Sequence, residues 1–136
     1  MENKIVWVWK SQENESSFII RECHCFKTGT NLKVKFKYKY GNFTLDIATA
    51  IMMLANILHN SLPLTTITGS VSSIYTNKQV WCHIKLRDRY FEFICLDIDC
   101  ESVLDGVAVA LTYVDAAELL QGISEVRQSN ESNNRS

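Results

Sequence analysis

Residues 32–40 read LKVKFKYKY, and this stretch decides the fold because apolar and basic side chains alternate through it without a break. Successive side chains of a β-strand point to opposite faces, so a period of two predicts a strand with one apolar and one basic face. We expect the apolar face to cover a core and the lysines to face solvent. The basic face consists of Lys33, Lys35, Lys37 and Lys39.

The segments before this stretch predict further strands, and the segment after it predicts a helix. Residues 5–9 and 18–26 are rich in β-branched and aromatic side chains, which favour strands. Beyond Gly41, apolar residues recur at helical spacing through residues 45–58. Asn42 or Thr44 is expected to cap this helix, and Pro63 to end it.

The second half of the chain repeats this order of strands followed by a helix. Asp115 and Glu118 have the spacing of a capping box, followed by an apolar stripe that predicts a closing helix up to Val126. Gly122 lowers the stability of this helix by up to about 1 kcal/mol relative to alanine. The predicted strands of this half are residues 67–75, 80–86, 90–98 and 107–113.

The sequence therefore predicts an α+β fold: a strongly twisted antiparallel sheet of about seven strands with two helices, in the order strands, helix, strands, helix. Residues 1–127 are expected to form a single domain, and residues 128–136 a disordered polar tail. At the level of topology alone, the order is similar to that of single-strand nucleic-acid binders of the Whirly type.

Composition excludes several classes of protein. The chain has 136 residues, of which 46% are hydrophobic and 21% charged, which is a globular balance. A formal net charge of -1 gives the molecule no overall field that would favour nucleic acid or a membrane surface. The longest mainly apolar segment, residues 45–58, is too short to span a bilayer, and no signal peptide is recognisable. We expect a cytoplasmic protein without membrane contact.

The cysteines predict buried, reduced thiols rather than disulfides or a metal site. Their number is odd, and most lie in apolar, strand-like surroundings, where a free thiol behaves as a small hydrophobe. Cys23 and Cys25 are separated by His24 alone, which is too close for the tight turn that wraps zinc. We therefore expect no metal and no cofactor. The cysteines are Cys23, Cys25, Cys82, Cys95 and Cys100.

Two groups of charges are candidates for partner binding. The lysines of residues 33–39 stand about 7 Å apart along one strand face, so they can track phosphates, meet an acidic protein surface, or keep an exposed strand soluble. Tyr38 and Tyr40 are expected on the opposite face, which argues against base stacking. The acidic group can form a solvated loop, a partner-facing patch or a cation site. It consists of Asp97, Asp99 and Glu101, with Asp105 nearby.

These observations favour binding over catalysis. No nucleophile turn, catalytic cysteine motif or metalloprotease helix is present, so we expect no enzyme. The preferred hypothesis is a bacterial protein-binding domain, such as an immunity protein that neutralises a toxin through a charged surface. The alternative is a single-stranded nucleic-acid binder that uses the lysine face. Trp7, Trp9 and Trp81 are candidate interface anchors, and a homodimer through an exposed strand edge or the Trp-rich amino end is compatible with the protein-binding hypothesis.

Overall fold

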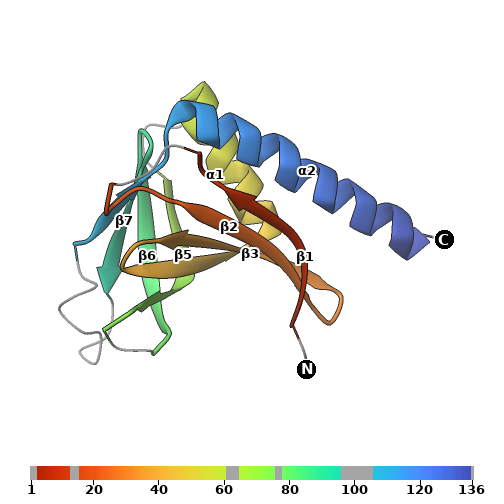
Figure 1. The fold of residues 1–136 in the computed structure, drawn as a ribbon, viewed down its shortest axis with the longest axis horizontal. Coiled ribbons are helices and arrows are strands. Elements are labelled where there is room, and N and C mark those ends of the chain that lie inside the picture. The colour runs from red at the N-terminus through yellow and green to blue at the C-terminus, as the bar shows by residue number, and fades with distance from the viewer. Residues whose placement is uncertain (1–2, 13–15, 61–64, 76–77, 96–105, 136) are drawn as a thin grey trace.

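The computed structural model describes residues 3–12, 16–60, 65–75, 78–95 and 106–135. Within them the chain forms one antiparallel sheet of eight strands and two helices, in the predicted α+β order (Figure 1). The first half contains β1 Asn3–Lys10, β2 Glu22–Thr28, β3 Asn31–Tyr38, β4 Gly41–Asp46 and α1 Ile47–His59. The second half contains β5 Thr65–Ser73, β6 Val80–Arg87, β7 Tyr90–Cys95, β8 Ala108–Ala110 and α2 Tyr113–Arg135.

The sheet curls around a core of aromatic side chains. Its strands lie side by side in chain order from β1 to β8. The ring of Phe43 on β4 nevertheless contacts Phe91 and Phe93 on β7, with centroids 5.2 and 5.4 Å apart. Because β7 lies three strands away from β4, only a bent sheet brings these rings together. Both helices cover the inner, concave side, where Met53 and Leu119 join the core (Figure 1).

One strand of the first half was not predicted. Residues 42–44 were interpreted as the start of a helix, but Gly41–Asp46 turns back along β3 as β4. Phe43 and Leu45 are buried and Thr44 is half-buried, which is the period of a strand. This alternation was missed because it is short and overlaps the apolar residues at helical spacing that begin at Leu45. Asn42 and Thr44 therefore do not cap α1, whose N-cap position is Asp46.

The helix boundaries differ from the prediction at three further points. Asn60, in the left-handed conformation, ends α1 before Pro63. The cap of α2 is Thr112, whose hydroxyl accepts a hydrogen bond from the Asp115 amide at 3.1 Å, so the N-cap lies three residues before the predicted Asp115. The helix also runs through residues 128–135, which were expected to be disordered. An ion pair from Arg127 Nε to Glu131 Oε1, 3.4 Å long, supports this extension. Neither described helix is long and apolar enough to cross a membrane.

The two edges of the sheet are not equivalent. At the β8 edge, residues 18–20 form a parallel bridge, in which the Ile20 amide donates to the Ala110 carbonyl and the Ala110 amide to the Phe18 carbonyl, both at 2.9 Å. This segment was predicted as part of the second strand. Within the described residues, β1 forms the other edge and pairs only with β2. One edge is thus covered while the other is open.

Candidate interaction surface on the outer sheet face

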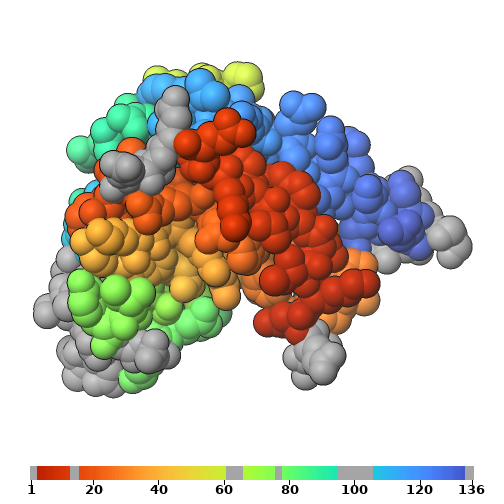
Figure 2. All heavy atoms as spheres, in the orientation of Figure 1, coloured from red at the N-terminus to blue at the C-terminus, as the bar shows by residue number. Residues whose placement is uncertain are grey.

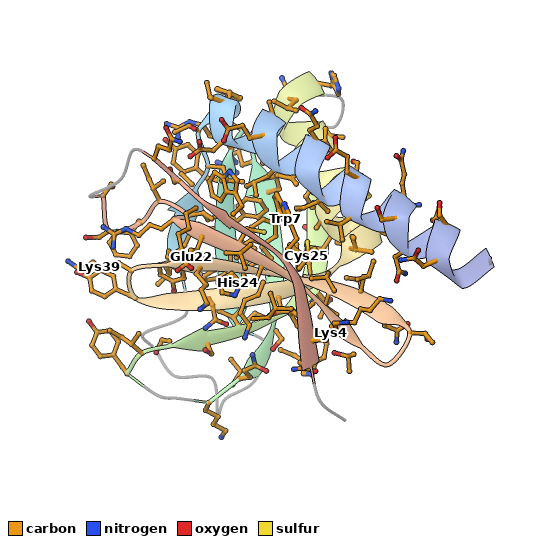
Figure 3. All side chains as sticks on the ribbon, turned by 45° about the vertical axis from the view of Figure 1, so that its right-hand side comes forward. Lys4, Trp7, Glu22, His24, Cys25 and Lys39 are labelled. Carbon is orange, nitrogen blue, oxygen red and sulfur yellow. The ribbon has the colours of Figure 1, made fainter. Side chains whose placement is uncertain are left out.

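The outer face of the sheet is the face that points away from α1 and α2, and the lysines of β3 lie on it. Leu32, Val34 and Phe36 are buried on the inner face, whereas Lys33, Lys35 and Lys37 are half-exposed on the outer face. The predicted alternation is therefore confirmed. Lys39 follows the end of β3 and is exposed in the turn (Figure 3).

Neighbouring strands supply acidic partners to part of this basic row. Lys33 Nζ forms an ion pair with Asp46 Oδ1 on β4, at 3.0 Å. Lys37 lies opposite Glu22 on β2. A hydrogen bond from His24, with Nε2 3.1 Å from Oε1, lowers the pKa of Glu22, and the Lys37 ammonium group lowers it further. The outer face therefore carries charges of both signs.

Lys35 differs from Lys33 and Lys37 because neither residue opposite it on the adjacent strands is acidic. It lies between His24 on β2 and Thr44 on β4. Its Nζ stands 5.7 Å from the ring centroid of Phe26, which is a cation–π distance. Because no carboxylate is its register partner, Lys35 is the ammonium group of β3 best placed to meet an external anion.

An exposed tryptophan stands beside this lysine. Trp81 on β6 is 65% exposed, which is unusual for so large an apolar side chain. It lines a shallow hollow of about 330 Å³, here called the Trp81 hollow, together with Phe26, Lys33 and Lys35. Figure 2 shows this side of the molecule indented between β1 in red and the green atoms of β5 and β6. The Trp81 hollow therefore places an exposed aromatic side chain next to the ammonium groups of Lys33 and Lys35.

A second hollow lies at the opposite end of the row. It encloses about 380 Å³ and is lined by Arg21, Lys37 and Lys39 among others. Tyr40 was predicted to lie away from the lysines, but it follows the end of β3, and Lys39 Nζ stands 5.5 Å above its ring. Tyr40 also stacks on Tyr75, which is 67% exposed. The expectation is therefore wrong for Tyr40, whereas Tyr38 is buried on the inner face as expected.

The thiols lie on the other side of the sheet. Cys23 and Cys25 are fully buried on the inner face, while His24 between them points outward to Glu22 (Figure 3). Burial raises the pKa of Cys25 to about 12 and that of Cys23 well above its ordinary value. Such thiols are poor nucleophiles and poor metal ligands near neutral pH. In the parts of the chain that the structure describes, no three Cys, His, Asp or Glu side chains gather as a metal site would need.

Comparisons with protein-family models, with curated proteins and with solved structures found no match.

Some residues of this surface were predicted and others were missed. Lys33, Lys35, Lys37 and Lys39 lie along one side of the molecule, in two groups at the two hollows. The predicted acidic residues Asp97, Asp99 and Glu101 lie outside the described residues. Phe26 was not singled out. The outward position of Trp81 follows from the alternation of buried residues after it on β6, so a register argument would have found it.

Proposed function

We propose that this protein is a non-enzymatic protein-binding domain whose outer sheet face docks onto another protein. The observation that carries the proposal is the pair of exposed aromatic side chains, Trp81 and Tyr75, at the two ends of a lysine row that no helix of the described chain covers. Large exposed aromatics with adjacent cations are typical of interface hot spots, which favour Trp, Tyr and Arg. The surface offers anchors for a partner rather than a closed pocket for a substrate.

The charge pattern favours a protein over a polyphosphate as the partner. A phosphate-tracking surface needs several uncompensated cations in a row. On β3, Lys33 is paired with Asp46 and Lys37 lies opposite Glu22, so Lys35 alone lacks an acidic register partner. A protein surface that carries a carboxylate beside an apolar side chain would match Lys35 and Trp81 together.

The specific form of the proposal is an inhibitor of the immunity-protein type, which neutralises a toxin in the cytoplasm. Cys23 and Cys25 support it, because they are free thiols of the kind that a reducing compartment maintains. The row from Lys33 to Lys39 would meet an acidic surface of the toxin. Asp97, Asp99 and Glu101 remain the proposed second contact.

The test is affinity capture from the native host with the full chain as bait, followed by binding measurements on the purified partner. Trp81→Ala should raise the Kd by at least about 30-fold, the effect of a hot-spot residue worth 2 kcal/mol. Lys35→Gln should slow association and weaken its dependence on salt. Met52→Ala is the matched control, because Met52 is 44% exposed on α1, away from the outer face. Wild-type affinity in Trp81→Ala would refute the proposed surface.

A second candidate function is binding of single-stranded nucleic acid, because aromatic rings do lie beside the lysines. Trp81, which is 65% exposed, lines the same hollow as Lys33 and Lys35, as base-stacking rings do in nonspecific single-strand binders. This function predicts salt-sensitive binding of a labelled single-stranded DNA. The affinity should fall when Lys33, Lys35, Lys37 and Lys39 are all replaced by glutamine. Undetectable binding at moderate salt, or binding unchanged by the four replacements, would exclude it.

A further inference from the structure

The open edge of the sheet carries an apolar strand that is accessible to a partner. β1 has eight residues and lies at the end of the strand order. Ile5 is 56% exposed, Val6 39% and Val8 46%, so three apolar side chains stand together along the edge. Natural sheets usually protect such an edge, because its unpaired amide and carbonyl groups can hydrogen-bond to another strand. Among residues 3–12, 16–60, 65–75, 78–95 and 106–135, a segment covers the β8 edge, residues 18–20, and none pairs with the outer side of β1.

A bulge sets which side chains of β1 share a face. Ile5 lies opposite Phe26, whereas Trp7 lies opposite Cys25, so Val6 is an extra residue between them. After the bulge, Val8 lies opposite His24. Phe26 and His24 both belong to the outer face, since they pair with Lys33 and Lys35. Ile5 and Val8 therefore share the outer face, although they are three residues apart.

This arrangement makes β1 complementary to itself. In an antiparallel pair with a two-fold axis between Val6 and Trp7, Ile5 of each copy lies opposite Val8 of the other. The outer face then gains a continuous strip of four apolar side chains, two from each copy. On the inner side, Lys4 would lie opposite Trp9, so no second charge faces it.

The charges of β1 favour the same register. Lys10 would lie opposite Asn3, so no two lysines face each other across the pair. A shift of one residue that places Lys4 opposite Lys10 would set like charges against each other, which is destabilising. It would also place Ile5, whose side chain points to the outer face, opposite Trp9, whose side chain points to the inner face. The register with Ile5 opposite Val8 therefore avoids repulsion between lysines and keeps the apolar side chains together on one face.

We infer that the protein forms a symmetric homodimer in which β1 pairs antiparallel with β1 of a second copy, Ile5 opposite Val8. Because residues 18–20 cover the β8 edge, this contact cannot propagate from edge to edge and closes as a dimer. The contact uses neither Trp81 nor Tyr75. The dimer would present two outer faces to its partners, and its formation does not depend on the proposed function.

The test is sedimentation velocity on the full chain over a concentration series, with two charge variants. The acidic variant combines Ile5→Glu with Val8→Glu, and the basic variant combines Ile5→Lys with Val8→Lys. We expect the wild type to sediment as a dimer and each variant alone as a monomer, because like charges then face each other. Mixing the two variants should restore the dimer, because each Glu then lies opposite a Lys. Met52→Glu, which changes an equally exposed apolar residue elsewhere, should remain dimeric.

Several outcomes would overturn the inference. A monomeric wild type would refute the dimer itself. A dimer that persists in either charge variant would refute the β1 contact, and failure of the mixture to dimerise would refute the register. Far-UV circular dichroism and the urea midpoint of each variant establish that the monomers are folded, so that loss of the dimer is not loss of the fold.

Discussion

The substitution Gly122→Ala tests how α2 packs on β1. In an isolated helix it would stabilise by up to about 1 kcal/mol, because glycine is a poor helix former. In this protein a methyl group at residue 122 would overlap Trp7 Cζ2 and stand 2.6 Å from Cη2. Since carbon atoms pack best at about 3.5 Å, the indole ring would have to move by more than about 1 Å. Figure 3 shows Trp7 between β1 and α2.

The expected result is a net destabilisation. Overpacking of this kind costs about 1–3 kcal/mol, so the free energy of unfolding should fall by about 1 kcal/mol after the helical gain is subtracted. The assay is urea denaturation followed by circular dichroism. In a Trp7→Ala background the obstruction is gone, and Gly122→Ala should then stabilise by up to about 1 kcal/mol. The coupling between the two sites is therefore about 2 kcal/mol.

Ser129→Ala, at an exposed position of α2, is the control for helix propensity and should stabilise by a few tenths of a kcal/mol. If Gly122→Ala stabilised the wild type as much as it stabilises the Trp7→Ala variant, the close approach of α2 to Trp7 would be refuted.

Three further predictions concern the β3–β4 turn and the pH dependence of stability. Gly41→Ala should lower the free energy of unfolding by about 3 kcal/mol or more, measured by urea denaturation, because its methyl group would overlap the Ser72 carbonyl oxygen and stand 2.9 Å from the Tyr38 hydroxyl. Between pH 9 and pH 12 the Cys25 thiol should lower the free energy of unfolding by up to about 1.4 kcal/mol per pH unit, because the unfolded chain loses this proton near 9.0 while the native state keeps it to about 12. In urea titrations, Cys25→Ala should remove this contribution and leave that of Cys23, whose pKa is also raised by burial. The lowered pKa of Glu22 stabilises the native state above its ordinary value of 4.5 and ceases to do so as the pH falls through the native pKa, so Glu22→Gln should flatten the acid limb of thermal unfolding.

The fold class could be predicted because most elements have a clear period. The alternation of residues 32–40 fixed the faces of β3, and the apolar stripe of residues 47–58 identified α1. β4 was missed because its alternation spans six residues and runs directly into that stripe. The covering of β8 by residues 18–20 was missed because a single bridge between distant segments leaves no local pattern.

The candidate surface was predictable in part. The outward direction of the lysines depends only on alternation, so the sequence contains it. The ion pair of Lys33 with Asp46 and the position of Lys37 opposite Glu22 depend on which strands are adjacent and in which register, which alternation within one strand does not show. The position of Tyr40 near Lys39 depends on where β3 ends.

The bridge between residues 18–20 and Ala110 also limits how far the chain can fold while it is being synthesised. Ile20 is fully buried and donates its amide hydrogen to a carbonyl 90 residues downstream. Trp9 similarly donates to Glu118, at 3.1 Å. The first half of the chain, β1 to α1, therefore cannot complete its contacts before the second half has been synthesised and has left the ribosome. Until then the aromatic residues of the first half remain exposed, so chaperones can bind them. The final docking of the two halves should be slow because it closes a long loop.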